Sequence, residues 1–485
     1  MGFPFNPVGA GLVYNVKSYR AFGDGVHDDT DAWVAGAKAA QAGGGGIVYG
    51  PSGIYLAQGL PLYSGVRYMG AGKGATTLRL PSSASYELFS TQVPSGGSLL
   101  NSGVSRMTID GNNTGLYGVL IDASLSNGII EQGSVFEHLR FQNCYVGWYH
   151  GANNSSAGPM AKNTVLRLSE FYNCAVGAFG YGTYGDTWDH LFTSGCTLAG
   201  VGTYGAPFLI LASGKPQPGG GPTTVLNLSD IHVEGLGNFS SGTDQGIAIN
   251  ASALLASNLE ISNSSLQALS VSAQETGICN LIDGVNVYGS GGGVTLNAAS
   301  AAGQAGILQN VSLSSVGRNT TWPGGYAQRQ YPFFIMAGSW EIAHGKVIYY
   351  SAGLIPYNVG LGDGTGAVGQ ASVHDVSFPT AGTAFLNIGD SAAILRVSQC
   401  PGVNPVGSSV PGTAFSLPAS GTAWTNQTGV DGTLFVTGAG VVTDVVVQGV
   451  TVASNLSVGQ SFFVPAGGTI TFTYSSAPTL VFVGN

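Results

Sequence analysis

Carboxylate side chains recur in a repeated segment in the middle of this chain. Segments that begin near residues 135, 165, 188, 225, 255 and 280 superpose on one another. The superposition predicts one outward column that contains Arg140, Glu170, Phe192, Asp230, Glu260 and Asn286. Adjacent coils would place Asp230 and Glu260 ~5 Å apart, and two coils would separate Glu170 from Asp230 by ~10 Å. Asp189 lies next to His190, close to the aromatic residues described below.

Paired carboxyl groups at such spacings are the catalytic equipment of glycoside hydrolases. Retaining enzymes hold the two groups ~5–5.5 Å apart, and inverting enzymes hold them ~6.5–9.5 Å apart. We therefore predict that the catalytic carboxylates belong to the set Glu170, Asp189, Asp230 and Glu260. Each of these residues taken singly also fits a solvated outward position.

Aromatic side chains follow the same segments and are expected to crowd at one corner. Exposed aromatic rings stack on the apolar faces of sugars, while their polar tips bind hydroxyl groups. The residues that we predict to bind substrate in this way are Trp148, Tyr149, Tyr181, Tyr184, Trp188, His190 and Tyr204. The alternative is that these rings pack beneath their own loops or fill a subunit interface.

The repeats themselves predict the architecture that positions these residues. Matched positions recur every 22 to 38 residues, and the shortest interval suits one coil of a parallel β-helix. Alternate residues of a strand face inward, which predicts an inward column of Phe141, Phe171, Ile231, Ile261 and Val287. At the next turn we expect a side-chain ladder of Asn143, Asn173 and Asn263. A stack of buried thiols should follow, formed by Cys144, Cys174 and Cys196.

The N-terminal segment 14–56 carries a sequence of motifs in a fixed order. A strand is followed by a Gly23-Asp24-Gly25 turn, the cap residues Asp28 and Asp29, an Ala-rich helix over 31–41, a glycine run and two further strands. This order resembles the N-terminal motif of the pectate-lyase-like superfamily, which includes polygalacturonase relatives, exo-glucanases and phage tailspikes. The resemblance implies a right-handed parallel β-helix closed by this helix, with Asp28 and Asp29 as capping residues rather than catalytic ones.

The resemblance does not extend to the catalytic motifs of the polygalacturonases. Their Gly-His-Gly and Arg-Ile-Lys motifs are absent from this sequence, so pectin hydrolysis is not implied. A lyase would need a basic residue to accept a proton, and the few candidates are Arg140, Lys162 and Arg167.

The composition of the chain limits the classes of partner that it is expected to bind. Only 8% of residues are charged, the net charge is −9 and no basic run is present, which argues against nucleic-acid binding and favours a polysaccharide or cell-surface glycan. No signal peptide and no apolar run long enough for membrane insertion are visible. The five cysteines lack metal-ligand spacing, so neither a metal nor another cofactor is predicted.

We expect an all-β chain with three parts: an N-terminal cap over 1–60, the β-helix over 61–400, and a small β-sandwich-like domain over 405–485 for trimerisation or glycan binding. The function that this organisation favours is that of a homotrimeric phage tailspike that binds and depolymerises a host polysaccharide, located on a virion tail, with other tail proteins as partners, or extracellularly. The alternatives are a non-catalytic receptor-binding tail or baseplate protein and a secreted glycanase or polysaccharide lyase.

Overall fold

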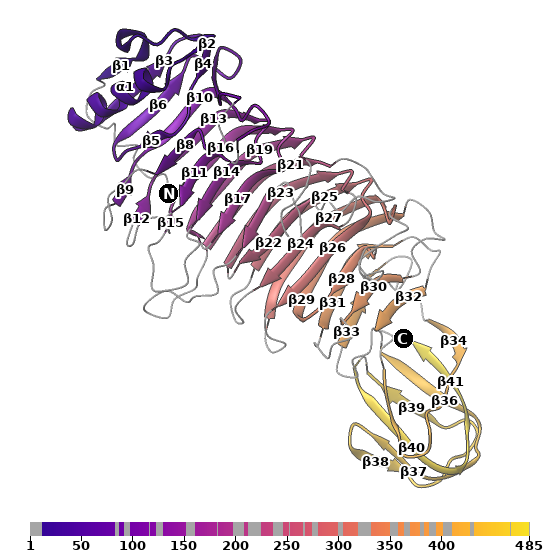
Figure 1. The fold of residues 1–485 in the computed structure, drawn as a ribbon. Helices are drawn as coiled ribbons and strands as arrows, with labels where there is room; N and C mark the ends of the chain where they lie inside the picture. Colours follow the sequence, from indigo (N-terminus) through magenta and orange to yellow (C-terminus); the bar gives the residue numbers. More distant parts are fainter. Residues whose placement is uncertain are drawn as a thin grey trace.

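The computed structural model of the 485-residue chain describes most of its length. The described residues are 12–82, 87–91, 98–115, 117–122, 130–151, 161–181, 183–196, 208–211, 225–235, 246–251, 253–264, 267–273, 280–298, 304–318, 331–349, 357–362, 369–378, 383–387, 394–400, 410–426, 431–465 and 467–484. They form an elongated stack of parallel strands with a helix at one end and a small antiparallel unit at the other (Figure 1).

The main body is the right-handed parallel β-helix that the sequence predicted. Its largest sheet has seventeen strands: β1 (Val13–Asn15), β2 (Asp24–Asp28), β3 (Gly46–Gly50), β4 (Gly53–Leu56), β6 (Val66–Gly70), β7 (Thr76–Arg79), β10 (Gly103–Asp110), β13 (Val135–Gln142), β16 (Val165–Tyr172), β19 (Asp186–Ser194), β21 (Val225–Glu234), β23 (Ala253–Ser262), β25 (Asn280–Tyr288), β27 (Gln304–Val316), β29 (Gly338–Tyr349), β31 (Gly369–Ser377) and β33 (Ile394–Ser398).

Two further parallel sheets complete the coils. The twelve-stranded sheet contains β5 (Leu60–Leu62), β8 (Phe89–Thr91), β11 (Tyr117–Asp122), β14 (Val146–Gly151), β17 (Val176–Tyr181), β20 (Phe208–Leu211), β22 (Ile247–Ala251), β24 (Gln267–Ala273), β26 (Gly292–Ala298), β28 (Phe333–Ile335), β30 (Tyr357–Leu361) and β32 (Thr383–Asn387). The four-stranded sheet contains β9 (Ser98–Leu100), β12 (Ile130–Gln132), β15 (Ala161–Lys162) and β18 (Thr183–Tyr184).

Helix α1 (Thr30–Ala42) closes the first coils, as the motif order predicted. Its Trp33 is fully buried and packs edge-on against Tyr55 at a ring-centroid distance of 5.4 Å. The Asp28 carboxylate accepts a hydrogen bond from the Thr30 N–H at the helix start. Asp29 occupies the N-cap position, but its side chain accepts hydrogen bonds from the backbone N–H groups of residues 22 and 23 instead. Both carboxylates are therefore structural, and Asp29 fastens the glycine turn rather than the helix.

Each long strand of the large sheet from β10 to β31 has a residue in the left-handed conformation near its middle, where the strand pairing is interrupted. We call this set the corner column; its members are Arg106, His138, Leu168, His190, Asp230, Asn258, Gly284, Asn310, His344 and Asp375. Each corner residue is skipped by the strand pairing, which resumes on both sides of it. Glycine, Asn, Asp and His tolerate this conformation best, which explains why polar side chains collect along this edge.

The register of strand β21 corrects one predicted column. Phe192 pairs with His232, and His232 pairs with Glu260. Asp230 is therefore not in the outward column with Glu170 and Glu260, because it is the corner residue of its strand. For the same reason Ile231 pairs with Leu191 and Leu259 and lies two residues away from the predicted inward column, in which Val233 takes its place.

The predicted Cys stack is present at the turn that follows the large sheet, and the predicted Asn ladder is present in part. Asn173 Nδ2 donates to Asn143 Oδ1 at 2.9 Å. Asn263 does not continue this ladder, because Gly195 and Gly235 occupy the same turn in the two coils between. Cys144, Cys174 and Cys196 are buried free thiols. The hydrogen bond with Cys144, together with burial, raises the pKa of Cys174 well above its ordinary value. A thiol that resists ionisation is a poor nucleophile and metal ligand, so the stack is structural.

The C-terminal unit consists of two antiparallel four-stranded sheets. One contains β34 (Val410–Ala414), β41 (Thr479–Gly484), β36 (Gly432–Gly438) and β39 (Ser461–Val464), and the other contains β35 (Ala423–Thr425), β40 (Thr469–Ser476), β37 (Val441–Val447) and β38 (Val450–Ala453). Their own apolar core includes the fully buried Leu434, Val445, Val464 and Ile470. This is the β-sandwich-like arrangement that the sequence predicted.

Candidate functional site

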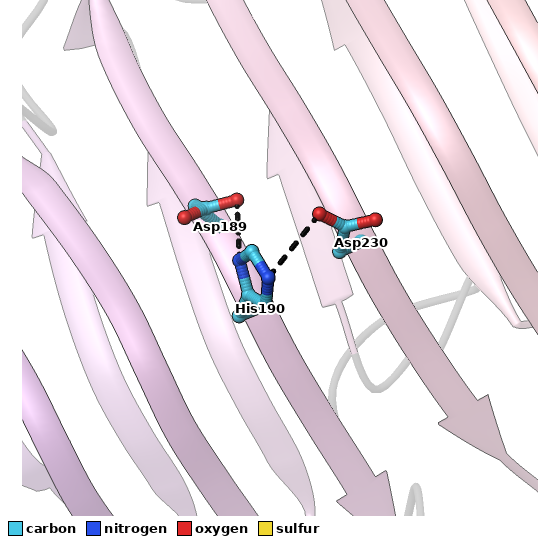
Figure 2. A group of neighbouring side chains, drawn as sticks. All are labelled: Asp189, His190 and Asp230. Carbon is cyan, nitrogen blue, oxygen red and sulfur yellow. Dashed lines mark ion pairs between the residues drawn. The ribbon is translucent and has the colours of Figure 1, made fainter.

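Three polar side chains meet at the corner of strands β19 and β21 (Figure 2). His190 Nδ1 lies 2.8 Å from Asp189 Oδ1, and His190 Nε2 lies 3.4 Å from Asp230 Oδ2. The side chains are 54%, 27% and 41% exposed for His190, Asp189 and Asp230 respectively. The result is an imidazole held between two carboxylates on the outer surface of the β-helix.

The corner column explains why these residues meet. His190 and Asp230 are corner residues of consecutive coils, so their backbones lie one strand spacing apart, ~4.8 Å. Asp189 directly precedes the corner and faces outward from the same strand. A short bend that favours Asn, Asp and His thus brings an acid, an imidazole and a second acid together without any inserted loop.

Neighbouring side chains fix the two carboxylates. The Ser229 hydroxyl donates to Asp189 Oδ1, and Asn258 Nδ2 donates to Asp230 Oδ1 at 3.0 Å. The hydrogen bond to Asp189 raises the pKa of His190 above its ordinary value, and the charges of both carboxylates add to this effect. The arrangement therefore favours the protonated form of the His190 imidazole.

The other two predicted carboxylates do not join this group. Glu170 binds Lys73 Nζ at 2.6 Å and the Arg140 guanidinium at 3.1 Å. Burial alone would raise the pKa of Glu170, but the hydrogen bonds from Lys73 and Arg140 outweigh it and lower the pKa. Glu260 pairs with His232 Nδ1 at 3.0 Å on the face beyond the corner. A carboxylate locked between two cations is a poor general acid, so the structure does not support the catalytic role predicted for Glu170.

The aromatic prediction is wrong for three residues. Trp148 and Trp188 are at most 1% exposed and pack against each other inside the core at a centroid distance of 5.5 Å. Tyr149 is 6% exposed and packs edge-on against Phe179. These residues lie in strands rather than loops, so alternation points the indoles inward. The side chains of Tyr181 and Tyr184, in β17 and β18, and the whole of Tyr204 lie outside the described part.

Of the three candidate bases for a lyase, two are paired with carboxylates and the third has a side chain outside the described part. Arg140 pairs with Glu170, and Arg167 pairs with Glu137 Oε2 at 2.6 Å. The side chain of Lys162 lies outside the described part. Neither described arginine is poised to accept a proton from a substrate.

Sequence reasoning placed His190 among the sugar-binding residues and did not connect it with Asp189 and Asp230 as one unit. It also missed the outward rings of Tyr172 and His232. The signal that could have found the triad is the recurrence of Asn, Asp, His or Gly at one position of successive repeats, which marks the corner.

The same three residues could hold a divalent cation. One ligand atom from each lies within 4.8 Å of the others, and within the described ranges no other group of three or more such residues meets this condition. Carboxylate and imidazole donors suit several divalent metals. The sequence had predicted no metal, so the effect of a chelator becomes part of the functional test.

A second His and carboxylate group repeats the corner pattern on β29 and β31. His374 lies 3.0 Å from Glu341 Oε1 and 2.9 Å from Asp375 Oδ2, and the corner residue His344 lies 3.8 Å from Asp375. The hydrogen bonds with Asp375 and Glu341 raise the pKa of His374. The His374 side chain is 27% exposed against 54% for His190, so a substrate has less access to this imidazole than to His190.

A third pair of this kind is buried between β14 and the first residue of β19. His150 and Asp186 are both fully buried, and His150 Nδ1 lies 2.7 Å from Asp186 Oδ2. Asp186 Oδ1 also accepts the Thr164 N–H at 3.1 Å. No substrate can reach these groups, so the pair fastens adjacent coils.

Comparison with known proteins agrees with this fold. Residues 13–114 match the family described as rhamnogalacturonase A/epimerase, pectate lyase-like. The mannuronan C5-epimerase AlgE2 of Azotobacter vinelandii is 39% identical over 116 residues, which are 22% of this chain and 12% of the epimerase. Alginate lyase 7 of the same organism is 40% identical over 116 residues, or 22% of this chain and 14% of the lyase. The chain thus matches only a small part of the length of either relative.

Solved structures of similar shape span more of the chain at low identity. The A-module of the Azotobacter vinelandii mannuronan C-5 epimerase AlgE4 covers 80% of this chain and 96% of its own length, with 17% identity and a TM-score of 0.40. The tailspike protein gp49 of Acinetobacter baumannii bacteriophage Fri1, a capsular polysaccharide depolymerase, covers 97% and 85% respectively, with 13% identity and a TM-score of 0.43.

The capped parallel β-helix and the match over residues 13–114 confirm the resemblance to the pectate-lyase-like superfamily. In the described part of the chain, no helix has the length and apolar character needed to cross a membrane.

Proposed function

We propose that this protein binds and depolymerises a polysaccharide, and that Asp189, His190 and Asp230 perform the cleavage by glycoside hydrolysis. The observation that supports this most directly is the outward-facing imidazole held between two carboxylates. The group supplies a proton donor and a base on a surface open to a long polymer, as general acid–base catalysis requires. A carboxylate oxygen of Asp189 and one of Asp230 lie within 4.8 Å of each other, slightly less than the ~5–5.5 Å that separates the carboxyl groups of retaining glycosidases.

The three side chains would divide the work as follows. The His190 imidazolium donates its proton to the glycosidic oxygen as the bond to the anomeric carbon breaks. Asp230, the more exposed carboxylate, accepts a proton from the water that attacks that carbon. Asp189 is a positioning residue, because its hydrogen bond orients His190 and raises the pKa of the imidazole. A proton returned from Asp230 through solvent to His190 restores the starting state.

A second candidate reaction is elimination or epimerisation at a uronate residue. The named relatives favour it, since they are mannuronan C5-epimerases and an alginate lyase. His190 would then act as the base that removes the proton next to the sugar carboxylate. This reaction also needs a positive group to neutralise that carboxylate, and the described arginines nearest the site are already paired with Glu137 and Glu170.

One assay separates these reactions. The protein is incubated with a panel of bacterial surface polysaccharides and alginate, with and without a chelator, while reducing ends and absorbance near 232 nm are followed. New reducing ends without absorbance support hydrolysis, whereas added absorbance supports elimination. Binding without either product contradicts the enzymatic proposal and favours a receptor-binding protein. Loss of cleavage with the chelator assigns a metal to the Asp189, His190 and Asp230 group.

The Asp230→Asn variant tests the assignment of the site. We expect it to lose cleavage by about 10²- to 10⁴-fold, as for other general acid–base groups, with unchanged thermal unfolding because Asp230 is 41% exposed. Full activity in this variant would remove Asp230 from the mechanism.

The proposed function includes an oligomeric state and a role for each domain. We propose a homotrimer on a phage tail, with the division into 1–60, 61–400 and 405–485 and with the last domain serving trimerisation or glycan binding. Exposed apolar side chains in that C-terminal unit support trimerisation, namely Phe435, Val441, Val450, Val452, Val458 and Phe463. Light scattering of the full chain and of a chain truncated after residue 400 would test this, and a monomeric full chain would contradict it.

A further inference from the structure

The charges of this chain are divided unevenly along the β-helix. Residues 1–172 contain ten Lys and Arg and ten Asp and Glu. Residues 173–317 contain eight Asp and Glu but a single basic residue, Lys215. Across the described part of this second stretch no Lys or Arg is present. The coils that carry the Asp189, His190 and Asp230 group are therefore strongly acidic.

Next to the corner, three outward rings form a continuous strip. Tyr172 and Phe192 have ring centroids 5.8 Å apart, and Phe192 and His232 are stacked at 5.0 Å with an interplanar angle of 23°. These rings come from the consecutive strands β16, β19 and β21, so the strip runs along the helix axis. We call Tyr172, Phe192 and His232 the ring strip.

The ring strip lies beside the proposed cleavage site. Phe192 and His232 each follow their corner residue by two positions, and the corner residues are His190 and Asp230. A polymer lying along the ring strip would therefore pass His190 at about two residues along the strand, ~7 Å.

Carboxylates border the far end of the ring strip. Glu260 is 65% exposed and pairs with His232, and the exposed Glu234 accepts a hydrogen bond from the Ser194 hydroxyl at 2.7 Å. Exposed carboxylates are strong acceptors for sugar hydroxyl groups, and aromatic faces stack on the C–H faces of sugar rings. The same carboxylates repel an anionic polymer, since like charges juxtaposed at an interface oppose binding.

The basic residues at the other end of the ring strip offset this repulsion only in part. Arg140 stacks over the Tyr172 ring at 5.2 Å and shares the single carboxylate of Glu170 with Lys73, so this cluster keeps one net positive charge against the four carboxylates of Asp189, Asp230, Glu234 and Glu260. Arg167 is neutralised by Glu137. A polyuronate would meet many carboxylates and few uncommitted cations along this path.

From these contacts we propose that the ring strip is the glycan-binding subsite and that its ligand is an uncharged polysaccharide of hexose or N-acetylhexosamine units, not a polyuronate. The inference deepens the proposed function, because it places the bound strand next to the cleavage residues. It also separates this chain from the alginate-acting relatives by the chemistry of its surface.

Binding is measured in the Asp230→Asn background, so that cleavage does not consume the ligand. The probes are neutral mannan, glucan, galactan and chitin oligosaccharides, with alginate and polygalacturonate as the anionic arm, in affinity electrophoresis or calorimetry. We expect binding to at least one neutral polymer and to neither polyuronate. Binding to a polyuronate alone, or to none of the probes, would overturn the proposal.

The Phe192→Ala variant tests the ring strip itself. Removing the central ring should weaken binding of the neutral polymer by up to about tenfold, the size expected for one aromatic stacking contact. The matched control is Phe22→Ala, because Phe22 also stacks on a histidine, His27, at 4.2 Å and is 57% exposed, but lies at the N-terminal end. Equal affinity in both variants would overturn the ring strip as the subsite.

The Glu234→Gln/Glu260→Gln double variant tests the charge argument. At low ionic strength its affinity for alginate should rise above that of the parent, and added salt should narrow the difference because it screens exposed charges. An unchanged alginate affinity would contradict the electrostatic selection.

These outcomes separate the two proposals. Binding through the ring strip with no cleavage by the wild-type chain would end the hydrolase proposal and leave the subsite. Cleavage with the same KM in wild type and Phe192→Ala would end the subsite proposal and leave the hydrolase proposal.

Discussion

The first coils of the β-helix and its middle coils treat their carboxylates differently. In the first coils three carboxylates pair with Lys or Arg: Asp110 binds Arg79, Glu137 binds Arg167, and Glu170 binds Arg140 and Lys73. In the middle coils the partners of Asp189, Asp230 and Glu260 among the described residues are His, Ser and Asn side chains.

This difference separates ion pairs that fasten adjacent strands from groups that can exchange protons. A guanidinium stays protonated at every relevant pH, so it holds a carboxylate ionised and inactive. Histidine changes its charge close to neutral pH, so a carboxylate bound to it belongs to a unit that can take up or release a proton. The same ladder of strands thus supports a structural surface in one region and a candidate catalytic surface in the next.

The largest effect is expected for His190→Asn. Asn tolerates the left-handed conformation of the corner, where His190 has φ 50°, so the fold should persist while the proton donor is lost. We expect kcat to fall about 10²- to 10⁴-fold, measured as reducing ends released from the polysaccharide that the wild-type chain cleaves.

The matched control for this variant is His344→Asn. His344 has φ 52°, occupies the same corner and also lies beside a corner aspartate, Asp375. Its activity should equal that of the wild type. If His344→Asn loses activity and His190→Asn does not, the catalytic group lies on β29 and β31 instead.

The buried pair of His150 and Asp186 is chemically similar to the pair of His190 and Asp189, but its loss should lower the stability of the fold. Asp186→Ala leaves His150 fully buried without its carboxylate, and removal of one partner from a buried pair costs about 3–5 kcal/mol. We expect a large drop in the denaturation midpoint. Asp189→Asn, which changes an exposed group, should leave the midpoint unchanged. Equal midpoints for the two variants would mean that His150 and Asp186 do not fasten the coils.

The fold was largely predictable from the sequence because its signals are local and repeated. The glycine turn, Ala-rich helix and strand pair predict the cap, and the Phe, Asn and Cys positions predict the coil. The predicted register of β21 was wrong. Residues 225–230 resemble residues 165–170 in sequence, but the strand pairing is offset from this alignment by two residues. Only the corner conformation of Asp230 reveals this offset.

The site was predictable in part. Asp189 and Asp230 were chosen because charged residues are scarce in this chain, and the structure brings both to His190. The prediction that the two tryptophans bind substrate was wrong, because a large aromatic residue after a turn is equally compatible with stacking on a sugar and with packing in the core. Trp148 and Trp188 lie on the inward face of their strands, and strand alternation could be assigned only once the register was known.

A smaller effect on stability is expected in the first coils for Glu170→Gln. The change removes the charge that Lys73 and Arg140 share. Because these partly exposed pairs are screened by solvent, the loss should be about 1 kcal/mol or less in the free energy of unfolding. Cleavage should be unaffected. A variant that unfolds normally but fails to cleave would return Glu170 to the catalytic set and erase the distinction between the two regions.

The smallest expected change is a shift of the pH profile in Asp189→Asn. The proposed donor is protonated His190, so cleavage should decline as pH rises through the pKa of His190, which lies above the ordinary histidine value because Asp189 accepts its hydrogen bond. Replacing Asp189 with Asn removes the negative charge that favours the protonated form, so the alkaline limb of kcat/KM should move to lower pH. Glu137→Gln, which alters a carboxylate paired with Arg167 rather than histidine, should leave the limb in place. If Asp189→Asn lowers the rate equally at every pH, Asp189 orients His190 without affecting its pKa. The carboxylates paired with histidine would then differ from those paired with arginine in their position and not in their ability to exchange protons.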